Sequence, residues 1–323
     1  MEDCDAILPQ WLRFVRGLVD SDDLPLNVSR EMLQESTALR FIKKQVTKRS
    51  VDILDEIATE KPEDYQTFWT TFGRILKEGL VVDSEWKERL AKLTRWSSTA
   101  QHESPEELSS LEQYVARMKE GQDAIYYVTG ESRDVLLGSP YLEALRARGY
   151  EVLLMTDPID TWAAEAIADF GGKKLVNAMR ADVKLPDGDK KNEEITKGFE
   201  ALAAAAKQVL EGKVREVRTS GRLVESPAVL VLAQGAMPAH LEKVMRAAGK
   251  EVPRGKRDLE LNPNHPVVKQ LATIASENPS DGRLHDFIVL LYEQALIAEG
   301  SPLEDPNGFQ RRLTSVLTHA VGG

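Results

Sequence analysis

The sequence predicts a mixed fold of α+β and α/β type, with a helical segment, a small α/β unit and an α+β region that ends in helices. In the first third of the chain, apolar residues recur at steps of three and four, which is the period of a helix. From residue 122 onward, short apolar runs alternate with helical stretches, as in a parallel sheet whose faces are covered. A chain of 323 residues with 42% hydrophobic residues is long enough for two or three packed units.

The net charge and the cysteine content limit the functional classes. A net charge of −10 argues against general binding to nucleic acid or to anionic membranes. Cys4 is the only cysteine, so the chain has no intrachain disulfide, and a reducing cytoplasm is the expected location. The first residues are acidic and no apolar stretch approaches about 18 residues, so we expect neither a signal peptide nor a membrane-spanning helix.

The N-terminal part is predicted to be helical. Residues 7–19 form one apolar segment, which cannot build a sheet with its own core and is typical of the tail of a domain. A long helix with an apolar stripe is expected after Pro25, because no proline or glycine follows before Pro62. Aromatic-rich helices at 65–79 and 84–94 are expected to pack in the core or between helices.

A change of period marks the small α/β unit. After a polar loop and a helix at 111–119, short apolar runs predict strands at 125–128, 152–155 and 174–178, with helical stretches between them. Residues 129–132 lack the glycine spacing and the Lys-Ser/Thr pair of a phosphate loop, so we expect no nucleotide there.

The last part combines strands with helices. A charged, glycine-containing segment at 186–192 is expected to be a linker. Strands are predicted at 214–219 and 228–233, and a short helix at 237–248. Further helices are predicted at 193–210, 267–276, 284–299 and 309–320.

Motifs for metal binding and covalent catalysis are absent from the sequence. The five histidines show no metal-binding spacing such as H-E-x-x-H, and there is no Ser-His-Asp set, Walker-type loop or dinucleotide fingerprint. We therefore expect the chain on its own to hold no metal or cofactor and not to turn over ATP.

One stretch, residues 24–36, carries an unusual charge. It begins as a loop and continues as a helix capped by Asn27 or Ser29, which places Arg30 in the first turn. A cation there opposes the helix dipole, and Gln34 lies four residues on along the same face. The pair suits an anion such as phosphate. Alternatively, Arg30 forms an ordinary ion pair on the surface.

The same region carries a family resemblance. Residues 14–36 resemble the catalytic-loop signature of the ninety-kilodalton heat-shock chaperones, most of all the bacterial HtpG type. Stretches at 114–121, 151–162, 214–227 and 261–266 also match, so the resemblance covers essentially the whole chain. It implies a molecular chaperone of stress response and protein folding, of which this chain has the later middle domain and the C-terminal dimerisation domain. The nucleotide domain would be missing.

The resemblance also implies a division into four parts. Residues 1–40 would be the remnant of the large middle-domain subdomain, with the catalytic loop, and residues 41–121 a helical segment of the middle domain. Residues 122–190 would be its small α/β subdomain. Residues 193–323 would be the dimerisation domain, which ends in a helical bundle shared by two copies.

Two residues are implied to act on ATP. In the family, residues at the positions of Arg30 and Gln34 contact the γ-phosphate of ATP, which a separate N-terminal domain holds. The full-length family uses ATP and Mg²⁺. Arg30 and Gln34 are therefore the predicted catalytic residues of a longer protein, whereas this chain alone is expected to be inactive.

The helix at 237–248 is the candidate binding surface. Met237, Leu241, Val244 and Met245 fall on one of its faces, and methionines adapt to varied partners. The same stripe could instead pack into the core of the chain itself.

The resemblance favours the binding surface. It implies that Met237, Val244 and Met245 contact unfolded or partly folded client proteins in a cleft between protomers. Trp162 and Glu165 match further contacts across that cleft. Glu165 departs from the family pattern, because a neutral polar residue is expected at its position.

The final two long helices are predicted to form a homodimer. The helix at 284–299 is apolar around so much of its circumference that it must be covered from more than one side. Pairing it and the helix at 309–320 with a second copy closes a four-helix bundle about a two-fold axis. The predicted interface residues are Phe287, Ile288, Leu290, Leu291, Ala295, Leu313, Val316 and Leu317. The chain lacks the acidic C-terminal motif of cytosolic eukaryotic members, so we expect no co-chaperone that binds such a tail.

Two alternatives stay open at this point. The chain could be a small α/β enzyme with a helical appendage, with its site at residues 129–134. It could also be a truncated relative that acts only as an adaptor or dimer partner.

Overall fold

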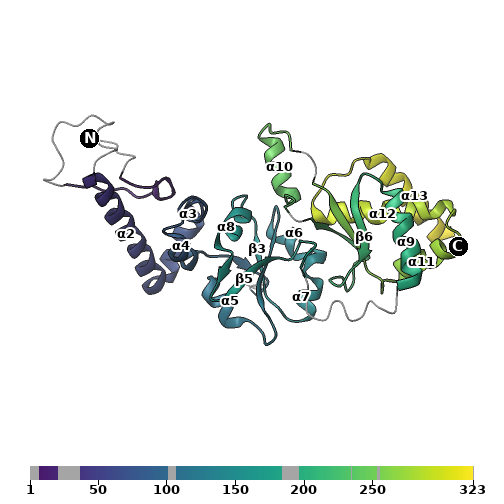
Figure 1. Cartoon of the computed structure of the whole chain (residues 1–323), viewed down its shortest axis with the longest axis horizontal. Coiled ribbons are helices and arrows are strands. Elements are labelled where there is room, and N and C mark those ends of the chain that lie inside the picture. Colours follow the sequence, from purple (N-terminus) through teal and green to yellow (C-terminus); the bar gives the residue numbers. More distant parts are fainter. Residues whose placement is uncertain are drawn as a thin grey trace. The chain divides into compact units, whose positions relative to one another are not determined.

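The chain folds into two compact units, which are described separately (Figure 1). The computed structural model describes residues 7–20, 37–100, 107–183, 196–233, 235–252 and 255–322. The first unit consists of Met1–Arg117 and Ile159–Leu175, and the second of Met118–Pro158 and Val176–Gly323. Helices and strands occur in both units, so the predicted mixed fold class is confirmed.

Helices dominate the first unit. They are the 3-10 helix η1 (Gln10–Leu12), α2 (Thr37–Glu60), α3 (Pro62–Val82), α4 (Lys87–Leu93), α5 (Leu111–Arg117) and α8 (Asp160–Ile167). The long helix expected from the sequence ends at Glu60, and Pro62 is the first residue of the next helix. Proline suits that position, because the first N–H groups of a helix have no partner within it.

The packing of η1 on α3 depends on a glycine. A Cβ at Gly79 would lie 2.8 Å from the ring of Trp11 and 2.6 Å from Leu90, so a larger residue would push both apart. Trp11 is buried, and its ring N–H donates to Asp83 at 3.2 Å. Arg13 donates to both carboxylate oxygens of Glu78, at 2.6 and 2.8 Å. The N-terminal segment is thereby attached to α3.

The first sheet has five strands in the order β1-β3-β2-β5-β4. They are β1 (Ser97–Ser98), β2 (Ala124–Thr129), β3 (Val152–Met155), β4 (Asp169–Phe170) and β5 (Lys173–Asn177). β2 and β3 are parallel, with Tyr126 opposite Val152, whereas β4 and β5 form an antiparallel hairpin. The three predicted strands are present, but the sheet is mixed rather than purely parallel. Three short helices accompany it: α6 (Arg133–Leu137), η2 (Pro140–Leu142) and α7 (Glu143–Ala147).

The second sheet, in the second unit, has three strands in the order β6-β8-β7. They are β6 (Val214–Thr219), β7 (Ala228–Leu232) and β8 (Arg257–Leu261); β8 runs parallel to β6 and antiparallel to β7. The helices of this part are α9 (Thr196–Val209), α10 (Ala239–Ala247), α11 (Pro266–Glu277), α12 (Gly282–Glu299) and α13 (Pro306–Gly322). The central strand, β8, was not predicted from the sequence, because its alternating charges are typical of an exposed segment.

The two faces of the second sheet have different neighbours. Leu259 and Leu261 of β8 lie in one apolar cluster with Leu202 of α9, Leu271 of α11 and Ile288 of α12. The other face of β7 carries Val229 and Val231, which share a second cluster with the first sheet, including Tyr126, Val152 and Leu154. Each face of this small sheet is therefore buried, which explains why all five residues of β8 are buried.

Among the described residues, no helix combines the length and the apolar composition needed to cross a membrane.

Candidate functional site

Helix α10 has a buried base and an exposed outer part. It begins after Pro238, and its first four residues, Ala239 to Glu242, are buried. Beyond them the side chain of Val244 is 42% exposed. Figure 1 shows α10 extending away from the three-stranded sheet of its unit. The helix is thus attached at its N-terminal end and presents its C-terminal half to solvent.

The predicted contact residues lie on α10 or, for Met237, just before it, and they differ in exposure. Met237 and Met245 are partly buried and Val244 is exposed, so these three are accessible. Leu241 is only 2% exposed and therefore does not belong to the accessible face, although it was predicted there. The sequence pattern placed Leu241 correctly on the apolar side of the helix, but this first part of the helix packs against its own unit.

Charged groups hold the buried base of α10. The Glu242 carboxylate accepts from Arg257 of β8 at 2.7 Å and from the backbone N–H of Gly255 at 3.1 Å. Arg257 also donates through Nε to Glu299, the last residue of α12, at 2.7 Å. Burial acts to lower the pKa of Arg257, but Glu299 and Glu242 outweigh it and raise the pKa above its ordinary value. The three side chains are almost completely buried.

A histidine also lies in this base. Burial lowers the pKa of His240 below its ordinary value, and the nearby charge of Glu131 opposes that shift. Within the described residues, Nε2 of His240 has no hydrogen-bond partner. Lys243, one turn further along, pairs with the same Glu131 at 2.7 Å on the surface. The sequence pattern predicted neither the burial of His240 nor the ion pair between Lys243 and Glu131.

The other predicted contact residues belong to the first unit. Trp162 and Glu165 lie on α8, where Trp162 is 38% exposed and Glu165 is exposed. The opposite side of this helix is buried, including Ala163 and Ile167. Both residues are thus accessible on the outer face of a helix that the interior of its unit holds in place.

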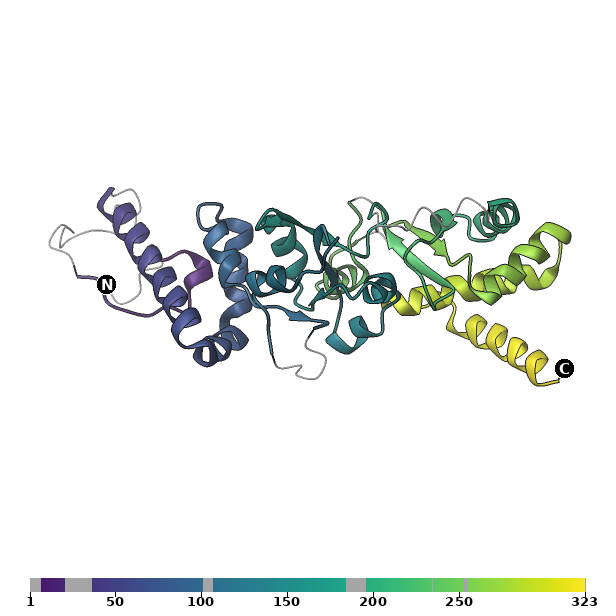
Figure 2. The same ribbon diagram turned by 90° about the horizontal axis from the view of Figure 1, so that it is seen from below.

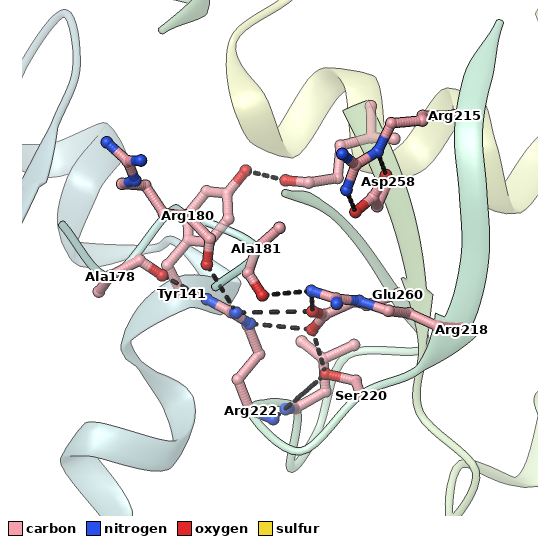
Figure 3. Close-up of polar contacts among 12 residues, drawn as sticks. Tyr141, Ala178, Arg180, Ala181, Arg215, Arg218, Ser220, Arg222, Asp258 and Glu260 are labelled. Atoms are coloured by element: carbon pink, nitrogen blue, oxygen red, sulfur yellow. Dashed lines mark hydrogen bonds and ion pairs between the residues drawn. The ribbon is translucent and has the colours of Figure 1, made fainter. Parts of the chain in front are cut away.

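Within the second unit, a polar cluster joins the three-stranded sheet to the segment that follows β5 (Figure 3). Glu260 of β8 accepts from Arg222 at 2.9 Å, from Ser220 at 2.9 Å and from Arg218 at 2.8 Å. Arg222 in turn donates to the backbone carbonyls of Ala178 and Arg180, which follow β5. Arg218 likewise donates to the carbonyl of Ala181.

Two further contacts strengthen this joint. The Tyr141 hydroxyl donates to the carbonyl of Leu230 in β7, and burial raises its pKa well above the ordinary value. Glu143 accepts from three successive backbone N–H groups, those of Val224, Glu225 and Ser226. Within the second unit, the part that contains β2 and β3 is therefore fixed to the three-stranded sheet by polar contacts as well as by the shared apolar cluster.

Residues 129–134, the alternative enzyme site, have structural roles. Thr129 is buried, and its hydroxyl contacts the sulfur of Met179. Glu131 pairs with Lys243, and Ser132 caps α6 by accepting from the N–H of Val135. Thr129, Glu131 and Ser132 are therefore each engaged in a structural contact.

The predicted dimer helices differ in exposure. In α12, Ile288, Leu291 and Ala295 lie in the apolar cluster of their own unit and Phe287 packs against it, while Leu290 is 8% exposed. In α13, by contrast, Leu313 is 38% exposed, Leu317 is 55% exposed and Val316 is partly buried. Figure 2 shows this last helix, which ends at the C-terminus, projecting from the rest of its unit. Of the predicted residues, Leu313 and Leu317 of α13 are the exposed ones.

The predicted phosphate-binding pair lies outside the described residues: this holds for Arg30, Gln34 and their whole loop. In the part of the chain that the structure describes, no group of three or more His, Cys, Asp and Glu side chains is arranged to hold a metal ion.

Comparison with known proteins identifies the family. The model of the Hsp90 protein family matches residues 1–323. Chaperone protein HtpG of Myxococcus xanthus is 51% identical over 326 residues, which cover 99% of this chain and 49% of that protein. Chaperone protein HtpG of Rhodococcus jostii is 45% identical over 327 residues, which cover 99% and 50%. The chain therefore spans about half the length of these relatives.

These matches establish the class of protein: the chain belongs to the Hsp90 family of chaperones. Within that family the relatives are bacterial HtpG proteins, so the family predicted from residues 14–36 and the later stretches is confirmed.

Proposed function

We propose that this chain is the part of an HtpG-type chaperone that binds unfolded or partly folded client proteins and dimerises. The observation that carries the proposal is the accessible apolar face of α10 above a buried, charged base. An exposed face on a stable helix is what a binding surface needs, because the helix does not depend on that face for its own packing. Methionine side chains such as Met237 and Met245 adapt to partners of different shape.

Trp162 supports the same proposal from the first unit. It is the one large aromatic side chain on α8, and its exposure of 38% leaves it available for contact. Tryptophan is strongly enriched among residues that dominate binding energy. Glu165, one turn further on, lies on the same side of the helix. We propose that it limits binding to clients without strong negative charge.

A test compares two exposed valines of the second unit. The Val244→Asp variant places a charge on the proposed surface and should weaken suppression of client aggregation in the absence of ATP. The Val267→Asp variant makes the same change on α11, where Val267 is 41% exposed, close to the 42% of Val244. It should behave like the unchanged chain. Equal loss in both variants, or in neither, would contradict the proposal.

We propose that the exposed residues of α13 form the dimer interface. Leu313 and Leu317 are four residues apart, so they form one apolar stripe on that helix. A second copy related by a two-fold axis would cover it, and the two pairs of α12 and α13 would form a four-helix bundle. Leu290 of α12 remains a candidate because it lies outside the main apolar cluster of its unit.

The ATP role is proposed for the longer protein only. Its basis is the family membership together with Arg30 and Gln34, and the family uses ATP and Mg²⁺. An arginine that reaches a γ-phosphate stabilises charge in the transition state without contributing much to ground-state binding. We also propose a location in the cytoplasm, in line with membership of the bacterial HtpG group.

A further inference from the structure

The base of α10 and the end of α12 share one arginine. Arg257 lies on β8, is 4% exposed and donates to Glu242 of α10 and Glu299 of α12, both at 2.7 Å. It also donates to the backbone carbonyls of Met237 and Gly255. A guanidinium has a planar, rigid set of donors, so these bonds fix the two helices relative to each other through one group.

Glu299 lies at the end of α12, just before the connection that leads to the last helix. It is the final residue of α12, and Gly300 then turns the chain in the left-handed region with φ of 84°. The hydroxyl of Ser301 donates to the second oxygen of Glu299 at 2.8 Å. Only a short connection follows before α13 begins at Pro306. The position of the Glu299 carboxylate therefore helps to set where α13 starts.

The charge balance of this cluster makes Arg257 hard to replace. Two buried carboxylates share one buried guanidinium, and the second cation nearby, Arg246, is 41% exposed and contacts Glu242 at 3.3 Å. If α10 moves and takes Glu242 with it, Arg257 must either follow or leave a buried carboxylate uncompensated. A displacement of α10 would therefore act on Arg257 and, through it, on Glu299.

We infer that Arg257 is a positioning residue that couples client binding on α10 to dimerisation through α13. A client that covers Val244 and Met245 immobilises α10, and this holds Arg257 between its two carboxylates. Glu299 and the start of α13 are then already ordered when the second copy binds, so dimerisation costs less conformational entropy. The coupling is positive, and by linkage the dimer also binds client more tightly than the monomer. This inference rests on the proposed function of α10 and α13.

The test measures the dimer dissociation constant of the 323-residue chain by sedimentation, with and without saturating reduced, carboxamidomethylated ribonuclease A, which stays unfolded and carries no net negative charge. In the unchanged chain the client should tighten the dimer at least about fivefold, the lower end of typical coupling between sites. In the Arg257→Met and Glu299→Gln variants the same client should change it less than about twofold. Glu299→Gln keeps the side-chain size and removes one charge, so it serves if Arg257→Met does not fold.

The matched control is Arg215→Met. Arg215 pairs with the buried Asp258, the neighbour of Arg257 on β8, whose side chain lies on the opposite face of the sheet. This variant also leaves a buried carboxylate without its arginine, but it should keep the fivefold effect of the client. If Arg257 only stabilises the fold, its variants and Arg215→Met will lose stability alike and all will keep the effect, which overturns the inference.

Two outcomes separate the inference from the function on which it rests. If the unchanged chain binds the client in a direct titration and forms dimers, but the client leaves the dimer dissociation constant unchanged, the coupling alone is refuted. If the direct titration shows no client binding, or the chain stays monomeric, the proposed function fails and the coupling fails with it.

Discussion

Lys77 of α3 and Asp160 of α8 form a buried ion pair in the first unit, with Nζ and Oδ1 2.6 Å apart. The Lys77 ammonium also lies 4.6 Å from the ring centre of Trp96 and 5.7 Å from that of Trp69. Asp160 is the first residue of α8, where a carboxylate interacts favourably with the helix dipole. The pair thereby fixes the helix that carries Trp162 only two residues further on.

Breaking this pair should destabilise the first unit. The Lys77→Met variant should lower the free energy of unfolding by about 3–5 kcal/mol, because the charge of Asp160 is then buried without its lysine. Urea denaturation measures the change. Removing Arg13 from its exposed pair with Glu78 by Arg13→Met should cost no more than about 1 kcal/mol. A loss below that level for Lys77→Met would show that the buried pair contributes little.

The base of α10 should weaken in mild acid. Burial lowers the pKa of His240, so the folded chain binds a proton there less readily than the unfolded chain, whose histidine has a pKa near 6.5. The neutral side chain therefore contributes stability above about pH 6.5, and that contribution is lost as the pH falls from there towards the lowered pKa. Hydrogen exchange of α10 amides at pH 7.5 and 5.5 should show faster exchange, after correction for the intrinsic rate, at the lower pH.

The variant His240→Gln should remove most of this pH dependence, since glutamine does not titrate in that range. His285→Gln provides the control, because His285 lies exposed on α12 and its loss should leave the exchange of α10 unchanged. A pH response of α10 that survives in His240→Gln would assign the effect to another group.

The exposed stripe of α13 should control the oligomeric state. At micromolar concentration the unchanged chain should sediment at twice its mass of 36.0 kDa. The double change Leu313→Asp and Leu317→Asp should give monomers with little loss of monomer stability, because both side chains are already exposed. Val267→Asp on α11 should leave the dimer intact. An unchanged chain that sediments as a monomer would refute the proposed interface.

In a full-length relative that carries this sequence, Arg30→Ala should lower ATP turnover by about 10³-fold or more while leaving ATP affinity nearly unchanged. The reason is that the arginine acts on charge that develops in the transition state. Steady-state turnover and a nucleotide-binding titration measure the two quantities. Turnover equal to that of the unchanged protein would remove Arg30 from the catalytic site.

The positions of apolar residues along the sequence predicted much of the fold. Continuous apolar runs gave β2, β3 and β7, and the period of three and four residues gave α3, α10 and α12, because burial imposes these patterns directly. The pattern failed at β8, where Arg257, Asp258 and Glu260 are buried. Sequence reasoning treats such charges as exposed, since their burial depends on partners about 40 residues away that a local pattern does not show.

The candidate site shows the same limit. The helical period identified the apolar stripe of α10, but it did not separate Leu241, which packs inward, from Val244, which is exposed. In α12, likewise, Ile288 and Ala295 belong to the core of their own unit, although the pattern equally allowed a partner to cover them. Periodicity shows that a side is apolar, whereas only the three-dimensional structure shows what covers it.

The alternation along β8 excludes a one-residue shift in the pairing of this strand. Arg257, Leu259 and Leu261 face α12 and its cluster, while Asp258 and Glu260 face the arginines of β6 and the loop after it. A slip by one residue would exchange the two sets, placing carboxylates against leucines on one side and leucines against polar carbonyls on the other. The mispaired sheet would be penalised on both faces at once. A one-residue insertion or deletion before β8 must therefore be accommodated entirely by the preceding loop. A chain whose loop cannot accommodate it will bury neither of the two apolar clusters that cover the sheet.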